Sequence, residues 1–450
     1  MEKRKAPARW RTLAAASLAV CGLTSGCYDR QELEQQAFVT TLGIDKAPDG
    51  LIDCTFRIAL PENPASGGGK GGDTPLAGTG PVTFRAHNIV EALTIANSSV
   101  ERTISLTHLG QVIFGEDLAR EGLSDELQAM TRFREFRPSL YLGVARGKAH
   151  DIIAADKPVL EHSPTRMPDS IADVGERTGL FPVVSLHDFI TVSSEHHMAS
   201  MMPTLSVNDS VKPNTQGQQG GQGQGGGGGG ANSGAGSDAG DKPLSFTSGQ
   251  VARSGGNPVE WMGAALFKEG RLVGTIDGRQ SMLLSVLQGH IKRTQMTVPD
   301  PLTKGQYLSL ALKTERTPVY TVRLGEPMQI GVLVPIEADV VSMKGSANYS
   351  LPQTRLKVEQ TLNRELSEQF TSVLSLLLNR YQCDVVPVAL HARHLFPTHE
   401  AYVNYPWEDR LKDAQVHVSV QLHVRRFGVQ LAPAGDQDQN QSQSQSTGRV

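Results

Sequence analysis

The sequence predicts an α+β fold of two folded bodies joined by a linker, and three observations lead to this fold class. Short segments of alternating apolar and polar residues, bounded by turn residues, indicate strands that pair as hairpins. Apolar residues at spacings of three and four from Val358 to Leu377 indicate one long helix. Between them, residues 212–242 consist mainly of glycine, glutamine and serine. We therefore expect a multi-domain chain with mixed, mostly antiparallel sheets and packed helices.

The N-terminal body, residues 27–210, carries both strand and helix signals. Two apolar segments flank Pro48-Asp49-Gly50, an order typical of a strand–turn–strand unit. Asn88 can cap a helix whose apolar residues recur on one face. The expected strands lie at 38–45, 51–60, 106–114 and 139–145. One helix is expected to begin after Asn88, and two more are expected at 123–133 and 148–155.

The tract between the two bodies lacks the apolar side chains that folding requires. Such a segment cannot bury enough surface to offset the entropy lost when the chain is ordered. A flexible chain of this length has a root-mean-square span of roughly 30 Å. The sequence therefore predicts a flexible Gly/Gln-rich linker at residues 211–245, and its polar composition predicts a disordered tail at residues 431–450.

The C-terminal body, residues 246–430, opens with a hairpin signal. Lys268-Glu269-Gly270-Arg271 separates two apolar segments and fits a tight turn. Residues 415–424 are apolar on one face and polar on the other, which is typical of a half-buried strand. The expected strands lie at 261–267, 272–276, 307–312, 319–324, 330–341 and 415–424, and the expected helices at 282–287 and 358–377.

The N-terminus has the order of a secretory signal. Five basic residues precede a short apolar run from Leu13 to Leu23, and small residues then lead into Cys27. The run is shorter than the ~20 residues that span a bilayer. A cysteine after the cleavage site resembles a bacterial lipobox, in which residues 1–26 are removed after Gly26 and Cys27 receives a diacylglyceryl group. Two acyl chains at one residue give stable anchoring. The simpler alternative is an ordinary signal peptide in which Cys27 is incidental.

Composition and charge limit the partners of the chain. Its 450 residues are 38% hydrophobic and 20% charged, which suits a globular protein of two or three domains. Removal of residues 1–26 takes away five Lys or Arg residues and one Glu, so the net charge changes from −3 to −7. A mildly acidic body argues against a nucleic-acid partner and gives no electrostatic help at an anionic membrane. The lipid would have to supply the membrane attachment.

Cysteine usage indicates no disulfide framework. Cys21 leaves with the signal peptide and Cys27 would carry lipid, so only Cys54 and Cys383 remain in the mature chain. We expect two buried free thiols, with a single bridge as the alternative. No second apolar run of eighteen residues occurs in the sequence, so no transmembrane helix is expected.

A search for catalytic, metal and cofactor motifs favours none of them. Lys70 lies in a glycine island, but its spacing does not fit a phosphate-binding loop. Pro397 interrupts the only histidine run with metal-like spacing, and no fourth ligand is placed to complete a zinc site. No Gly-x-Ser-x-Gly or His-Glu-x-x-His motif occurs. We therefore expect no enzyme, no cofactor and no metal, and the histidines are interpreted as solvated: His196, His197, His391, His394 and His399.

Three motifs in order carry a family resemblance. The first is Gly-Cys-Tyr-Asp-Arg-Gln-Glu-Leu at 26–33, followed by an apolar segment that ends Gly43-Ile44-Asp45. The second is Gly-Ala-Ala-Leu-Phe-Lys-Glu-Gly-Arg-Leu-Val-Gly at 263–274. The third is the long helix, then Cys383-Asp384, and a final strand that ends Arg-Phe-Gly at 426–428. Together they resemble the Ger(x)C family of spore germination lipoproteins, from which the chain departs at Tyr28, where the family usually has tryptophan, and at residues 385–391.

The resemblance implies a C-type subunit of a nutrient germinant receptor. Such a subunit would be held by lipid on Cys27 at the outer face of the spore's inner membrane, beside A-type and B-type integral-membrane subunits. It would be a non-enzymatic scaffold of three α/β domains, two in residues 27–210 and one in residues 246–430. The alternative is a solute-binding lipoprotein of an importer, but a flexible tract of about thirty residues between the bodies would not hold a shared cleft. A secreted hydrolase is disfavoured because no nucleophile constellation is present.

Overall fold

The computed structural model describes most of the chain between Gln35 and Phe427. Residues 1–34 other than Ser17, the segments 60–79 and 212–243, and residues 428–450 lie outside the described residues, as do several shorter gaps. The described residues are 35–59, 80–159, 166–208, 210–211, 244–291, 293–314, 316–343 and 351–427, together with Ser17 and Tyr349.

The first sheet is built from strands on both sides of the glycine-rich segment. Its strands are β1 (Gln36–Lys46), β2 (Ile52–Ile58), β3 (Val82–Ala86), β4 (Thr103–Ser105), β5 (Gln111–Phe114), β6 (Tyr141–Ala145), β7 (Ser200–Val207), β8 (Val259–Lys268) and β9 (Arg271–Ile276). Their order is β3-β2-β1-β5-β6-β7-β8-β9, with β4 beside the start of β1. The hairpins expected around residues 48–50 and 268–271 are both confirmed.

The centre of this sheet is parallel and its two ends are antiparallel. β1, β5, β6 and β7 run in the same direction, whereas β2, β3, β8 and β9 pair antiparallel. Parallel neighbours need crossover connections, which the helices between these strands supply. Of the strand expected at 106–114, only residues 111–114 form a strand, β5, whereas residues 106–110 form the turn that separates it from β4. The helical elements are η2 (Pro48–Gly50), α2 (Ile89–Ala96), α3 (Glu116–Glu121), α4 (Ser124–Arg132), α5 (Ala149–Ala155), α6 (Met167–Thr178) and α7 (Leu186–Ser194).

Helices cover both faces of the parallel centre. Val112 and Phe114 of β5 point into a core with α2, α3, α4 and α7, whereas Ile113 between them packs with α5. Successive side chains of a strand point to opposite faces, so a strand buried on both sides is apolar throughout. This explains why β5 carries no polar alternation.

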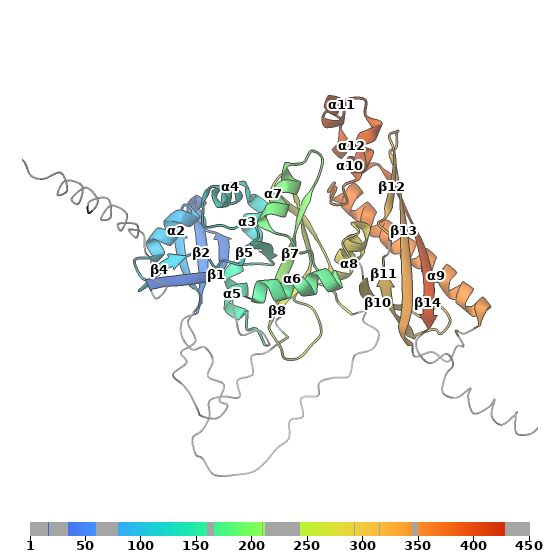
Figure 1. Ribbon diagram of the computed structural model, residues 1–450, viewed down its shortest axis with the longest axis horizontal. Helices are drawn as coiled ribbons and strands as arrows, with labels where there is room; N and C mark the ends of the chain where they lie inside the picture. Colours follow the sequence, from blue (N-terminus) through green and yellow to red (C-terminus); the bar gives the residue numbers. More distant parts are fainter. Residues whose placement is uncertain are drawn as a thin grey trace, which may run out of the picture.

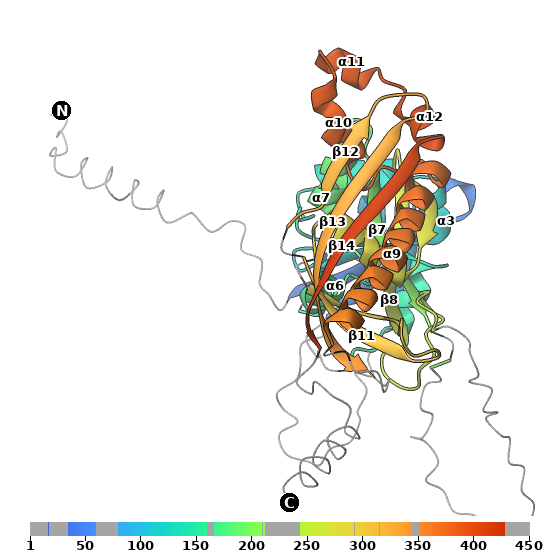
Figure 2. The same cartoon turned by 90° about the vertical axis from the view of Figure 1, so that its right-hand side faces the viewer.

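The second sheet lies against one long helix. Its strands are β10 (Arg293–Pro299), β11 (Tyr307–Lys313), β12 (Val319–Arg323), β13 (Gln329–Met343) and β14 (Gln415–Phe427), in the order β10-β11-β13-β12 with β14 parallel to β13. Helix α9 (Pro352–Ser375) crosses one face of this sheet and continues as a π-helical turn, η3 (Leu376–Arg380). Figure 2 shows α9 running beside β14 and a group of short helices gathered at one end. These are α10 (Val388–Ala392), η4 (Arg393–Leu395), α11 (His399–Val403) and α12 (Trp407–Lys412).

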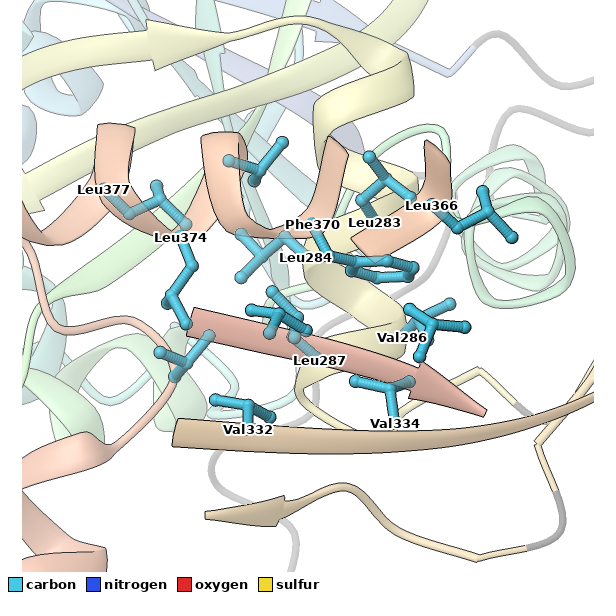
Figure 3. Packing of buried hydrophobic residues seen from close by; sticks show 14 of the residues in the cluster. Leu283, Leu284, Val286, Leu287, Val332, Val334, Leu366, Phe370, Leu374 and Leu377 are labelled. Atoms are coloured by element: carbon cyan, nitrogen blue, oxygen red, sulfur yellow. The ribbon is translucent and has the colours of Figure 1, made fainter. Parts of the chain in front are cut away.

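Helix α8 (Gly278–Leu287) is the element that joins the two halves of the molecule. It lies between the first sheet and the second, as Figure 1 shows, and packs against β8 on one side and α9 on the other. Its side chains from Ser281 to Leu287 are all buried. A helix that is apolar on all sides is buried on all sides. Figure 3 shows Leu283, Leu284, Val286 and Leu287 of α8 packed with residues of α9, η3 and β13, which are Leu366, Phe370, Leu374, Leu377, Val332 and Val334.

The C-terminal body does not begin as a separate unit. β8 and β9, which we expected to open that body after residue 246, extend the first sheet, because β8 pairs antiparallel with β7. The backbone N–H and C=O groups of β7 therefore find their partners in a strand that follows the glycine-rich segment. The α+β class with two sheets and packed helices is confirmed, and the three-domain division stays a prediction.

A row of side chains on α9 covers the edge of β14. The N–H groups of Val418, Val420, Leu422 and Val424 donate to Thr371 Oγ1 (3.0 Å), Ser367 Oγ (2.9 Å), Asn363 Oδ1 (2.6 Å) and Glu359 Oε1 (2.8 Å). Four helical residues advance about 6.0 Å and two strand residues about 6.6 Å, so the two spacings match along the contact. These four outer N–H groups of the strand are thereby satisfied inside the chain.

Candidate functional site

The predicted site residues Gly26 and Cys27 lie outside the described residues. The described chain resumes at Gln35, eight residues after Cys27. Eight residues reach at most about 28 Å, so a lipid on Cys27 would keep the start of β1 within that distance of a bilayer. β1 lies inside the first sheet between β2 and β5. The tether would thus attach to the framework of the protein.

The aspartate of the first motif holds a helix against the sheet. Asp45, at the end of β1, accepts hydrogen bonds from the N–H groups of Ala149 (2.7 Å) and His150 (2.9 Å) at the start of α5. These N–H groups have no partner within the helix. A Cβ at Gly115 would collide with Asp45 Oδ1, so only glycine leaves room for the carboxylate. Burial raises the pKa of Asp45, although the two N–H donors act in the opposite direction.

The aspartate of the third motif repeats this arrangement in the other half. Asp384 accepts hydrogen bonds from the N–H groups of Val388 (2.9 Å) and Ala389 (2.7 Å) at the start of α10. Its own carbonyl accepts from the N–H of Ala199, just before β7. Burial raises the pKa of the Asp384 carboxyl to about 6, and the backbone N–H donors lower it by less. Asp384 therefore orients the short helices and ties them to the first sheet.

The backbone conformation requires glycine at the first position of the second motif. Gly263 in β8 has φ of 85°, and a Cβ there would collide with the carbonyl oxygen of Ile276. Only glycine combines a positive φ with so close an approach of another strand. In the described part of the chain, the motif residues that carry the family resemblance therefore fix the framework.

An aromatic cluster joins the loop before β7 to the short helices. We define the aromatic cluster as His197, Phe396, Tyr402, Tyr405 and Trp407. Trp407 is buried, and its ring centroid lies 5.8 Å from that of His197 and 5.1 Å from that of Tyr405. His197 Nε2 lies 3.0 Å from the carbonyl oxygen of Tyr402. Burial lowers the pKa of His197, so its neutral form is favoured here. His197 is thus a packing residue and was wrongly interpreted as solvated.

A network of polar side chains secures both sides of the glycine-rich segment. Glu260 on β8 accepts from Asn208 Nδ2 (2.6 Å) before the segment and from the N–H of Gly249 (2.8 Å) after it. Arg253 Nε also donates to Glu260 (2.7 Å). The network continues through Asn257 to the half-buried ion pair of Asp156 with Arg57. Buried charges persist where hydrogen bonds and counter-charges compensate them, as they do here. Sequence reasoning missed this network because its members are spread over about 200 residues.

The remaining candidates from the sequence do not assemble into a reactive site. His391 stacks on Tyr320 with ring centroids 4.4 Å apart, whereas His399 lies near His196. In the described residues, no group of three or more His, Cys, Asp or Glu side chains is arranged to hold a metal ion. Lys70 lies outside them.

The two cysteines are buried in separate cores. Cys54 belongs to the core of the first sheet and Cys383 to the core around α8 and α9, and both thiols are free. Burial raises the pKa of each to about 12, so both stay protonated at neutral pH. The expectation of two buried free thiols is confirmed.

A cavity of about 410 Å³ lies beside the β1–β2 turn. It is rimmed by acidic residues of α3 and α4, and Lys46 pairs with Glu121 at 2.9 Å. Burial raises the pKa of Glu126 in its wall. A carboxyl of raised pKa can transfer protons, but the residues that line this cavity include no cysteine or histidine, and its one serine, Ser124, begins α4.

No helix among the described residues is long and apolar enough to cross a bilayer.

The fold and the motif residues define a class of two-sheet α+β framework protein, and comparison with known proteins gives the family. The family described as "Spore germination protein N-terminal domain" matches residues 29–207, and "Spore germination B3/ GerAC like, C-terminal" matches residues 262–428. The chain belongs to this family of spore germination proteins, which confirms the resemblance that its motifs indicate.

Relatives extend over nearly the whole chain. The putative spore germination protein YfkR of Bacillus subtilis (strain 168) is 24% identical over 419 residues, 92% of this chain and 95% of that protein. Spore germination protein KC of the same organism is 23% identical over 437 residues, covering 94% and 98%. The crystal structure of the GerBC protein has a TM-score of 0.47 and 17% identity, and the match covers 88% of this chain and 100% of that one.

Proposed function

We propose that the chain is the lipid-anchored, non-enzymatic C-type subunit of a spore germinant receptor. It is held at the outer face of the spore's inner membrane by a diacylglyceryl group on Cys27, next to A-type and B-type integral-membrane subunits. The observation that carries the proposal is the match of both family halves in order, directly after the Gly26-Cys27 motif. The receptor requires this subunit in order to assemble or respond to nutrients.

The geometry supports a framework role. Asp45 and Asp384 bind helix N-termini, and the two free thiols are buried and protonated. These groups serve the fold, which leaves the surface as the functional part of the protein. A framework that presents fixed surfaces suits assembly with membrane subunits.

The continuous first sheet also weighs against the importer alternative. A solute-binding lipoprotein closes two lobes about a hinge. Here β7 and β8 pair across the glycine-rich segment, and α8 is buried between the halves. Closure would have to break these contacts. Genes for receptor-type membrane subunits beside this gene support our proposal, and genes for a permease and an ATPase would contradict it.

The lipid anchor is tested by Cys27→Ala. We expect this variant to lose radiolabelled palmitate, to leave the spore membrane fraction after a salt wash and to slow germination, because it lacks the acyl chains and the net negative charge of the body does not attract it to an anionic bilayer. Cys21→Ala is the matched control, since it removes a cysteine six residues earlier and should keep all three properties. Retention of unlabelled Cys27→Ala protein in washed membranes would show that the anchor is wrongly assigned.

A further inference from the structure

A cavity on the second sheet carries an unusual concentration of charge. It has a volume of about 220 Å³ and lies on the face of the sheet that points away from α8 and α9. Its walls come from four strands, and their lining residues are Arg293, Ala311, Lys313, Glu337, Ala338, Asp339, Arg425 and Arg426. Four of these side chains are cations and two are carboxylates, so the cavity has an excess of positive charge.

A β-bulge aims two consecutive arginines into this cavity. Up to Ala338 the register pairs β13 with β14 residue by residue, but Asp339 pairs with Arg426, so Arg425 is the additional residue. Val424 before the bulge is buried, whereas Arg425 and Arg426 are both exposed. In a regular strand these two side chains would point to opposite faces. Bulges re-aim side chains in this way and are frequent beside binding sites.

The neighbouring strands β10 and β11 add two more cations to the lining. Arg293 of β10 and Lys313 of β11 occupy directly opposite positions. Like charges at such positions destabilise a sheet. The guanidinium groups of Arg293 and Arg426 form no hydrogen bond or ion pair within the described part of the chain, whereas that of Arg425 pairs with Glu337 at 2.8 Å. An anion in the cavity would give the guanidinium groups of Arg293 and Arg426 a partner.

Asp339 restricts the kind of anion that fits. Its Oδ1 atom is buried and has no hydrogen-bond partner in the described residues. An ionised carboxylate can only accept hydrogen bonds. A fully deprotonated anion such as sulfate would face this oxygen with repulsion, whereas hydrogen phosphate can donate its O–H to Asp339 and offer its other oxygens to arginine. Ala311, between Arg293 and Asp339 in the lining, has a small side chain that leaves room for such a group.

We propose that this cavity binds a protonated phosphate group, held by Arg293 and Arg426 and selected by Asp339. The group can belong to free phosphate or a phosphate monoester, or to the headgroup of phosphatidic acid. These sources share the same chemistry at the cavity and differ in whether a bilayer is present.

Calorimetric titration of the full chain carrying Cys27→Ala tests the proposal, because this chain has no lipid of its own. We expect inorganic phosphate to bind at least about tenfold more tightly than sulfate at pH 7. Arg293→Ala and Arg426→Ala should each weaken phosphate binding about tenfold. Arg323→Ala, an exposed arginine of β12 outside the cavity, is the matched control and should have no effect. Thermal unfolding of each variant verifies that the sheet is intact.

Asp339→Asn tests the selection directly. The amide can donate a hydrogen bond to a fully deprotonated anion. This variant should therefore bind sulfate as well as phosphate and lose the preference of the unmodified protein. Co-sedimentation with phosphatidic acid vesicles, abolished by Arg426→Ala, would identify a lipid source, and phosphate binding without vesicle binding would identify a free one. The proposal is wrong if neither phosphate nor vesicles bind, or if unmodified Asp339 protein binds sulfate as tightly as phosphate.

Discussion

Asp45 and Asp384 lie in different halves of the molecule and perform the same task. Each carboxylate accepts two backbone N–H groups at the start of a short helix, and each is buried. Such helices are too short to be stable alone, so a carboxylate that satisfies their first N–H groups decides where they form. The aspartates of the Gly-Ile-Asp and Cys-Asp motifs thus stabilise the fold. The sequence alone showed these motifs only as a resemblance to a family.

The raised pKa of Asp384 predicts a pH dependence of stability. The carboxyl has a pKa of 3.8 when unfolded and about 6 when folded, because burial disfavours its charge. Folding then takes up a proton between pH 4 and 6, so the free energy of unfolding falls as pH rises through this range and is level above it. Between pH 4 and 6 we expect the free energy of unfolding to fall by about 3 kcal/mol more in the unmodified protein than in Asp384→Asn, whose amide does not titrate.

Urea unfolding followed by the fluorescence of buried Trp407 measures this difference at several pH values. Other carboxyl groups titrate in both proteins, so their contributions cancel in the comparison. A difference between the two proteins that stays constant from pH 4 to 6 would show that the pKa of Asp384 is not raised.

Among secondary-structure elements, the contact of α9 with β14 is the most regular. Polar residues at spacings of four on α9 serve the alternate N–H groups of β14, on the opposite side of the strand from β13. Unpaired strand edges invite pairing with other chains, and proteins protect them by covering the edge with another element. The apolar stripe of the helix that is visible in the sequence fills the core, and this neighbouring polar stripe closes the sheet.

Ser367→Ala tests this contact against a matched serine of the same helix. It leaves the N–H of Val420 without its partner, so we expect a loss of about 1–3 kcal/mol in the free energy of unfolding. Ser372→Ala alters an exposed position and should change stability by less than about 0.5 kcal/mol. Urea unfolding of both variants makes the comparison. Equal effects would mean that the hydrogen bond to β14 contributes nothing beyond helix propensity.

At the scale of the whole molecule, the sequence predicts local units well and long-range pairing poorly. The hairpins and α9 follow from patterns within a few residues, and all are confirmed. β7 was missed because Pro203 interrupts its pattern, and proline is tolerated here because it lies at the irregularity in the β7–β8 register. Its partner β8 lies more than fifty residues further on, so no local signal could reveal the pairing. The structural roles of Asp45 and Glu260 also depend on contacts with residues distant in the sequence. The prediction of a cleavage and lipid-attachment site at Gly26 and Cys27 depends on the sequence motif alone.

The pairing of β7 with β8 predicts that the glycine-rich segment can be shortened without loss of stability. Its two ends are fixed by the polar network around Glu260, and halving a flexible loop changes its closure free energy by only about 0.6 kcal/mol. We expect deletion of residues 220–235 to leave the urea midpoint and the cooperativity of unfolding unchanged. Glu260→Ala is the contrasting variant and should cost at least about 2 kcal/mol, because Arg253 and Asn208 lose a buried partner. If the deletion destabilises the protein as much as Glu260→Ala does, the segment itself contributes to the folded structure and its interpretation as a linker is wrong.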